Sequence, residues 1–207
     1  MLKLLEQKLN LRFKNQKVLD IGCGHGGMLL EFHQKKCQVV GIDPDKNALN
    51  FSKKKYPYLN LINQSAEKMN FKKNSFDLII INGSLEHVYD VNMVMKKVGK
   101  YLKKNGYLFL EGKGYPLDKK ENYFNFSHHR LFTKNSFSNL CAKYQIFKLT
   151  TSYKSPLNIH KMKFASLSHK NFAQMANSKG NLYWIGQKKK LKKYKMIKDT
   201  FFKKFFK

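Results

Sequence analysis

The stretch that decides the fold is VLDIGCGHGG, residues 18–27. A short apolar run, Val18–Ile21, passes into a loop with glycine at positions 22, 24, 26 and 27. Glycine lets the main chain turn tightly and approach a ligand closely, and the N-terminus of a following helix favours negative charge. The stretch therefore predicts a strand, a ligand-binding loop and a helix.

Two nucleotide-binding patterns fit this loop. Gly22, Gly24 and Gly27 satisfy G-x-G-x-x-G, the dinucleotide pattern. Asp20, placed two residues before Gly22, extends the loop to D-x-G-x-G-x-G, with Gly26 as the last glycine. Tight turns produce either pattern by chance, so the loop alone leaves both open.

Asp43 strengthens the prediction of a nucleoside site. It ends the next apolar run, and adjacent strand ends lie side by side in an α/β sheet. Asp43 could therefore accept hydrogen bonds from two ribose hydroxyls. The alternative is that Asp43-Pro44-Asp45 is only a turn and a helix cap.

Strand and helix patterns alternate from residue 17 to residue 112, which predicts a Rossmann-like, mostly parallel sheet with helices on both faces. The predicted strands are 17–21, 38–42, 59–63, 76–81 and 107–111, the helices between them are 26–35, 45–54 and 91–102, and a Lys103–Gly106 turn ends the last helix. A helix over 133–144 follows, and an antiparallel pair, 145–153 and 181–187, completes seven strands.

The 207 residues suit one domain with small appendages. Leu2, Leu5, Leu9 and Phe13 have helical spacing and predict an amphipathic helix over 2–13, within an N-terminal segment 1–15. The domain is expected over 16–187, with a lid at 113–131 and an insertion at 154–180. Residues 188–207 form a basic aromatic tail.

Four segments together resemble the class I S-adenosylmethionine-dependent methyltransferases, of the small-molecule type with a Leu-Glu-His segment. They read VLDIGCGHG (18–26), VVGIDPD (39–45), NQSAEKMNFKKNSFDLIIINGSLEHVYD (63–90) and LKKNGYLFLEG (102–112). A weaker fifth match, His128–Thr133, is similar to the H-x-R-x-F-T entry to a late helix. The resemblance covers about residues 16–150 and favours a cationic sulfonium ligand over a pyrophosphate.

The resemblance implies roles for particular residues. The loop after the first strand would hold the methionine end of S-adenosylmethionine, Asp43 the ribose, the 65–66 segment the adenine, and the end of the fourth strand the reacting centre. The implied cofactor-binding residues are Asp20, Gly22, Cys23, Gly24, Asp43, Ser65, Ala66 and Asn82. An Asp is common in the family where Ser65 stands, so the adenine contact is expected to be weaker.

The chain has only 13 acids, and Asp20, Asp43, Glu67, Asp77 and Glu86 are among those that lie in these motifs. That clustering fits a positively charged cofactor in a chain so poor in acids. No grouping of His, Cys, Asp and Glu has metal-ligand spacing, so no metal is expected.

Methyl transfer is an in-line displacement that needs a general base only when the acceptor must lose a proton. His87 and His128 are the candidate bases, and for each the alternative is a structural role.

Neither an Asn-Pro-Pro-Tyr nor a Pro-Cys motif is present. By family analogy this leaves a small molecule, lipid or sugar as acceptor. Trp184 and aromatic residues of the lid suggest an aromatic pocket, or belong to the core.

The most unusual feature of the composition is its high positive charge. Lys and Arg total 41 against 13 Asp and Glu, a net charge of +28. Such a field attracts anionic membranes or polyanions, although a generally basic proteome would explain it as well. The tail pairs lysines with a Phe-rich stripe, which is typical of a peripheral membrane binder. Docking of the tail on the domain, or disorder, is the alternative, and nucleic acid is less favoured because lysine is a poor base reader.

An odd number of cysteines, Cys23, Cys37 and Cys141, favours a reducing, cytoplasmic setting. The N-terminus does not resemble a signal peptide, and no apolar run is long enough to span a membrane. The main alternative to an enzyme is a non-catalytic nucleoside-binding module that its charge recruits to membrane or nucleic acid. A nucleotide-dependent oxidoreductase is third.

Overall fold

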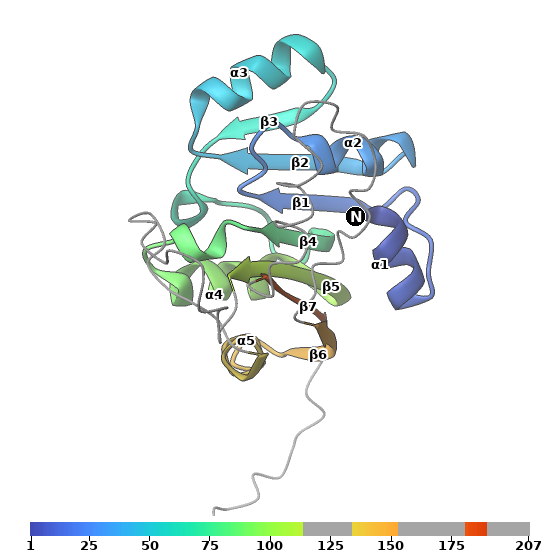
Figure 1. Ribbon diagram of the computed structural model, residues 1–207, viewed down its shortest axis with the longest axis vertical. Coiled ribbons are helices and arrows are strands. Elements are labelled where there is room, and N and C mark those ends of the chain that lie inside the picture. Colours follow the sequence, from blue (N-terminus) through green and yellow to red (C-terminus); the bar gives the residue numbers. More distant parts are fainter. Residues whose placement is uncertain (114–133, 153–180, 190–207) are drawn as a thin grey trace, which may run out of the picture.

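The computed structural model describes residues 1–113, 134–152 and 181–189. They form a seven-stranded sheet in the order β3-β2-β1-β4-β5-β7-β6 (Figure 1). The strands are β1 (Lys17–Ile21), β2 (Gln38–Asp43), β3 (Asn60–Asn63), β4 (Phe76–Asn82), β5 (Leu102–Lys113), β6 (Ile146–Ser152) and β7 (Asn181–Lys188). The helices are α1 (Leu2–Leu9), α2 (Gly27–Gln34), α3 (Lys46–Lys55), α4 (Val91–Tyr101) and α5 (Lys134–Ala142), with short 3₁₀ turns η1 (Ala66–Lys68) and η2 (Leu85–His87).

Strand directions confirm the predicted fold class. β1 pairs in parallel with β2 and β4, β2 with β3, and β4 with β5. β7 lies antiparallel between β5 and β6. Because the first five strands run the same way, their carboxyl ends meet at one edge of the sheet (Figure 1).

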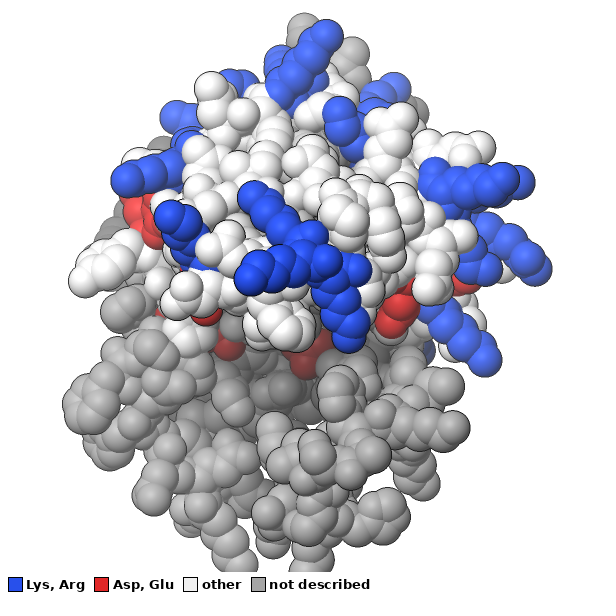
Figure 2. Space-filling model, turned by 90° about the horizontal axis from the view of Figure 1, so that it is seen from above, with Lys and Arg blue, Asp and Glu red and all other residues white. Residues whose placement is uncertain are grey.

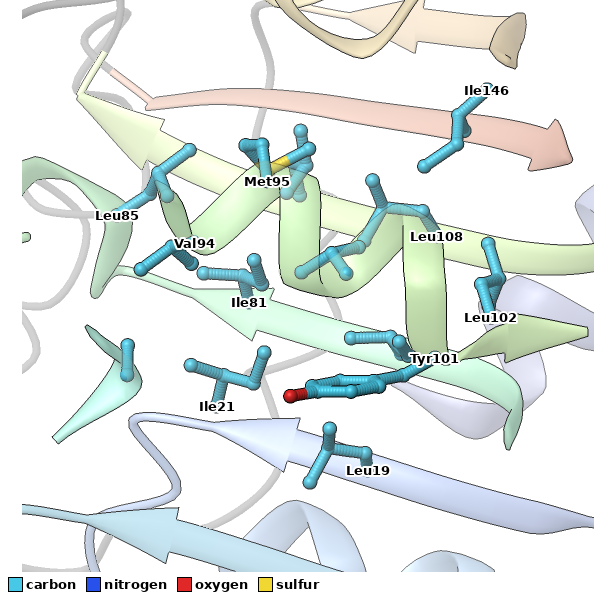
Figure 3. Close-up of a cluster of buried hydrophobic side chains, with 14 of the residues drawn as sticks. Leu19, Ile21, Ile81, Leu85, Val94, Met95, Tyr101, Leu102, Leu108 and Ile146 are labelled. Atoms are coloured by element: carbon cyan, nitrogen blue, oxygen red, sulfur yellow. The ribbon is translucent and has the colours of Figure 1, made fainter. Parts of the chain in front are cut away.

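Two apolar clusters cover the two faces of the sheet. Helices α4 and α5 pack on one face, over alternating residues such as Leu19, Ile21 and Ile81 (Figure 3). Helices α1, α2 and α3 contribute to the other cluster, which contains Val18 and Ile80. Side chains alternate along a strand, so Asp20 faces the same side as Val18. Both faces are buried, as expected for central parallel strands.

The junction between α4 and β5 differs from the prediction. The sequence indicated a turn over Lys103–Gly106 before a strand, whereas β5 already begins at Leu102. Pairing with β4 jumps from Phe76↔Leu102 to Leu78↔Tyr107, so the intervening residues bulge out of the ladder. Asn105 has φ 64°, a left-handed conformation that lets the main chain turn out of the ladder. The sequence therefore identified the residues at which the chain turns, but these residues lie inside β5 and not before it.

The N-terminal helix is shorter than the predicted 2–13. It ends at Leu9, and Asn10 takes a left-handed conformation with φ 49°. Phe13 is nevertheless buried, packing edge-on against Phe32 with ring centroids 5.5 Å apart. The apolar spacing therefore identified a core residue but not a continuous helix.

Several predictions fall outside the described residues. They are the lid from residue 114 onward, the insertion at 154–180, the tail beyond residue 189, and His128. The division into 1–15, 16–187 and 188–207 stays a prediction, although β7 itself includes Lys188. No helix within the described ranges combines the length and apolar character needed to cross a bilayer.

Candidate cofactor and active site

Sheet register brings four predicted positions to one edge. Ile21 pairs with Ile42 on one side and Ile81 on the other. The residues that follow these three, namely Gly22, Asp43 and Asn82, therefore lie side by side where the strands end. Alternation directs Asp43 and Asn82 to the face that carries Asp20, which lies two residues below Gly22 in β1.

The glycine loop turns over the end of β1 in a conformation that needs glycine. Gly22 has φ 76°, and Gly24 and Gly26 also have positive φ. The amides of Gly22 and Cys23 both donate to the Ile42 carbonyl, at 2.8 and 3.1 Å. A Cβ on Gly22 would lie 2.4 Å from the Cβ of Ser84, so no other residue fits without movement.

Asp43 organises this loop. Its Oδ2 accepts the Gly24 amide and its Oδ1 accepts the Asp45 amide, each at 2.8 Å. Helix capping belongs instead to Asp45, whose Oδ1 accepts the amides of Asn47 and Ala48. A carboxylate has about four lone-pair directions, so Asp43 keeps acceptor capacity for ribose hydroxyls.

Asp20 is fully buried, and neither of its carboxylate oxygens has a hydrogen-bond partner among the described residues. Burial, and then the negative charge of Asp43, raises the pKa of Asp20 from 3.8 to about 7. A carboxyl group held in this way is stabilised as an anion by a nearby cation or N–H donor. The residues therefore fit a ligand with a positively charged end.

The segment predicted to border the adenine follows β3. The Gln64 amide donates to the Asp43 carbonyl at 3.0 Å, and the Asn63 side chain donates to the same carbonyl at 3.0 Å. These bonds join the end of β3 to that of β2. Half-buried Ser65 and buried Ala66 come next, at the start of η1.

The fourth strand ends at half-buried Asn82. Gly83 follows with φ 60° and donates its amide to the Glu111 carbonyl at 2.9 Å. His87 lies in η2 with its side chain exposed, and its amide donates to the Ser84 carbonyl at 3.2 Å. His87 thus belongs to the same region, but its role as a base stays a prediction.

Two residues of this region had no assigned role. Ser84 Oγ donates to the Ile21 carbonyl at 2.7 Å, which fixes the segment after β4 against the glycine loop. Glu111 pairs with Asn82 in the ladder and is only 4% exposed. An acid that ends an apolar strand is the pattern that identified Asp43, and it also marks Glu111.

The acids within the motifs do not all surround the cofactor site. Asp77 lies near the start of β4, at the opposite edge, where it accepts the Lys17 amide at 2.9 Å and pairs with Lys103 at 2.8 Å. Glu67 accepts the Tyr89 amide at 2.9 Å. Asp77 and Glu67 therefore make structural contacts, and the clustering of acids in the motifs is weaker evidence for a cationic ligand than the sequence suggested.

Trp184 belongs to the core and not to an exposed aromatic pocket. It is fully buried in β7, and its Nε1 donates to Ser138 Oγ at 3.1 Å. Within residues 1–113, 134–152 and 181–189, no three His, Cys, Asp or Glu side chains are grouped to hold a metal ion.

Comparisons with known proteins agree with this geometry. A family model described as a methyltransferase domain matches residues 19–110. Over 101 residues the chain is 39% identical to the ubiquinone biosynthesis O-methyltransferase of Pelagibacter ubique, covering 47% of this chain and 42% of that protein. It is 30% identical over 102 residues to the (S)-tetrahydroprotoberberine N-methyltransferase of Eschscholzia californica, covering 46% and 29%. The matches thus span less than half the length of these relatives.

Solved structures share the fold at low sequence identity. Phosphoethanolamine N-methyltransferase 2 of Haemonchus contortus, in complex with S-adenosyl-L-methionine, aligns with a TM-score of 0.71 at 18% identity, covering 91% of this chain and 52% of that one. A SAM-dependent methyltransferase from Archaeoglobus fulgidus aligns with a TM-score of 0.69 at 14% identity, covering 90% and 92%. Residues 19–110 therefore match a methyltransferase domain, and the fold around them is shared with S-adenosylmethionine-dependent methyltransferases.

Proposed function

We propose that this protein transfers a methyl group from S-adenosylmethionine to a small-molecule or lipid acceptor. The observation that carries the proposal is the edge formed by Asp43, Gly22 and Asn82, with the unpartnered carboxylate of Asp20 beneath it. It combines acceptors for a ribose, bare main chain for close approach, and an anion for a cationic ligand.

We assign each of these residues a part in holding the cofactor. Asp43 accepts from the ribose hydroxyls, Asp20 stabilises the positively charged methionine end, and Ser65 and Ala66 border the adenine. When bound, S-adenosylmethionine supplies an activated methyl carbon. The chain's own task is to bind and orient the acceptor near Asn82, because displacement requires an in-line approach.

The relatives favour an acceptor built on an apolar ring system. They are named for ubiquinone biosynthesis, for a tetrahydroprotoberberine and, in a Caenorhabditis elegans sterol 4-C-methyltransferase 27% identical over 134 residues, for a sterol. We therefore place quinone-like, alkaloid-like and sterol-like compounds ahead of sugars. For a hydroxyl acceptor, His87 or His128 would accept the departing proton.

The three cysteines support a reducing, cytoplasmic location for this activity. Cys23, Cys37 and Cys141 are all free and buried. Burial raises the pKa of the Cys23 thiol well above its usual range, which keeps it protonated and unreactive beside the glycine loop.

Incubation of the protein with methyl-labelled S-adenosylmethionine and a lipid extract tests the proposal. The expected result is S-adenosylhomocysteine together with label in an organic-soluble product. Asp20→Ala is the matched control, because it removes the anion without touching the acceptor side. If the protein binds S-adenosylmethionine but forms no S-adenosylhomocysteine with quinol, amine or sterol acceptors, the result would instead support the non-catalytic nucleoside-binding module.

A further inference from the structure

The surface over α3 carries aromatic side chains that the cofactor site does not use. Phe51 is 59% exposed and Tyr58 is 56% exposed, although both are large and partly apolar. Figure 2 looks down on this end of the molecule, where lysines are spread among uncharged side chains. One of these large exposed side chains lies in α3 and the other only three residues after its end, which makes this segment a candidate interaction site.

Ring contacts hold these side chains in place. Tyr58 stacks on His33 of α2, with ring centroids 4.7 Å apart and planes 23° apart. Phe51 meets the edge of His25, with centroids 5.4 Å apart. The rings are therefore ordered in advance, which reduces the entropy lost on binding a partner.

Positive charge accompanies the rings. Lys54 and Lys55 are exposed and follow Phe51 by three and four residues, so they share its side of α3. No Asp or Glu occurs between Asp45 and Glu67. We call Phe51, Lys54, Lys55 and Tyr58 the aromatic–lysine face, and its charge requires an anionic partner.

We propose that the aromatic–lysine face docks on the surface of an anionic phospholipid bilayer. Aromatic rings partition into the headgroup boundary, and lysines beside them pair with lipid phosphates while their stems cover apolar surface. A membrane fits better than a nucleic acid, because the face lies on a helix at the rim of the sheet and contains lysine without arginine, the better partner for phosphates and bases.

The face is joined to the cofactor loop by short contacts. Ser52 of α3 is buried, and its Oγ donates to the His25 carbonyl at 2.9 Å. His25 directly follows Gly24, whose amide is held by Asp43. Docking through α3 would therefore keep the glycine loop close to the bilayer. The inference concerns binding alone and does not depend on methyl transfer.

Sedimentation of the full chain with lipid vesicles tests the proposal. The vesicles are phosphatidylcholine alone, or phosphatidylcholine with roughly one third phosphatidylglycerol. Phe51→Ser with Tyr58→Ser is expected to weaken binding to the anionic vesicles by about tenfold or more. Met93→Ser with Leu149→Ser, at two other exposed apolar side chains, is the matched control and should change little.

A second pair of variants separates local charge from total charge. Lys54→Glu with Lys55→Glu should abolish most binding. Lys143→Glu with Lys148→Glu makes the same change of net charge at exposed positions near α5, at the opposite end of the molecule from α3 (Figure 1), and should have a small effect. Equal effects of both pairs would mean that binding follows net charge, and the proposal would be wrong.

Insertion of the face is measured separately. Phe51→Trp should show fluorescence quenching by brominated lipids, whereas Leu149→Trp should not. All variants should keep the circular dichroism spectrum and melting temperature of the parent, since every altered side chain is exposed. Unchanged vesicle binding by the variant with Phe51→Ser and Tyr58→Ser overturns the proposal. The proposal is also wrong if this variant binds a single-stranded oligonucleotide less tightly than the parent but still binds vesicles equally well.

Discussion

The carboxylate of Asp43 holds the main chain of Gly24, with its Oδ2 accepting the Gly24 amide at 2.8 Å. The two residues lie 19 positions apart: Gly24 follows β1, whereas Asp43 is the last residue of β2. The other oxygen of Asp43 accepts the Asp45 amide at the start of α3. One side chain therefore fixes both the glycine loop and the next helix, in addition to its proposed contact with ribose.

Asp43→Asn should destabilise the loop and weaken cofactor binding. An amide keeps one acceptor oxygen but presents N–H donors in place of the other, so the amide of Gly24 or Asp45 loses its partner. We expect a loss of about 1–3 kcal/mol in the free energy of unfolding and at least about tenfold in affinity for S-adenosylmethionine. Urea unfolding and calorimetry measure the two effects. Asp45→Asn is the control and should change both little, because Asn caps helices as well as Asp does.

Gly22→Ala should be far more damaging than Gly24→Ala. Both glycines have positive φ, which costs other residues about 1–2 kcal/mol. Only at Gly22 does an added Cβ collide, at 2.4 Å from the Cβ of Ser84, whereas nothing lies within 4 Å at Gly24. Overpacking adds about 1–3 kcal/mol at Gly22. Thermal unfolding should rank the variants, and Ser84→Gly should partly rescue Gly22→Ala. Equal losses for the two glycines would contradict the collision.

Cofactor affinity should rise with pH over the acid range. The pKa of Asp20 is raised to about 7 by burial and by Asp43, so the group is mostly protonated at pH 5 to 6 in the free protein. A cationic ligand favours the anion, and binding must then release the proton. We expect affinity to increase by up to about tenfold per pH unit below pH 7. Calorimetry at pH 6 in buffers of different ionisation enthalpy should detect the released proton, and Asp20→Asn should release none.

Asp20 should also destabilise the ligand-free protein as pH rises. Its folded pKa, about 7, lies above the ordinary value of 3.8, so the folded state binds the extra proton between these limits. The penalty is therefore absent below about pH 4, grows between pH 4 and 7, and is complete above pH 7. Three pKa units correspond to at most about 4 kcal/mol. Asp20→Asn should melt at a higher temperature than the parent at pH 8 but not at pH 4. An equal difference at both pH values would exclude titration of Asp20 as the cause.

Lys188 should stabilise the end of α4, although the sequence suggests only the start of a basic tail. Its Nζ donates to the carbonyls of Gly99 and Leu102, at 2.7 and 2.6 Å. Lys188→Met keeps the stem and should cost about 1.5–3 kcal/mol, because hydrogen bonds to a charged donor are lost. Lys189→Met, at the exposed neighbour, should cost less than about 0.5 kcal/mol. Urea unfolding of both variants, compared at equal ionic strength, measures the difference.

Local patterns were sufficient for most of the fold. The glycines after Ile21 and the helix cap at Asp45 lie where the sequence indicated, since each depends on the conformation of a few neighbouring residues. The bulge at Asn105 was missed, because a turn inside a paired strand has the same local sequence as a turn between elements. Phe13 was placed in a helix for a similar reason, since apolar spacing reports burial and not hydrogen bonding.

The sequence by itself determined the order of strands and helices, the glycine loop and the acids Asp20 and Asp43, because these follow from main-chain sterics and alternation. Only the tertiary structure decided which acids act together. The strand register places Asp43 and Asn82 beside Gly22, and it places Glu111 next to Asn82. Asp77 instead lies at the opposite end of the strands, beside Lys17. The pKa of Asp20 is likewise a tertiary property, because its desolvation and its exposure to the charge of Asp43 arise only when β1 and β2, whose paired residues are 21 positions apart, pack together.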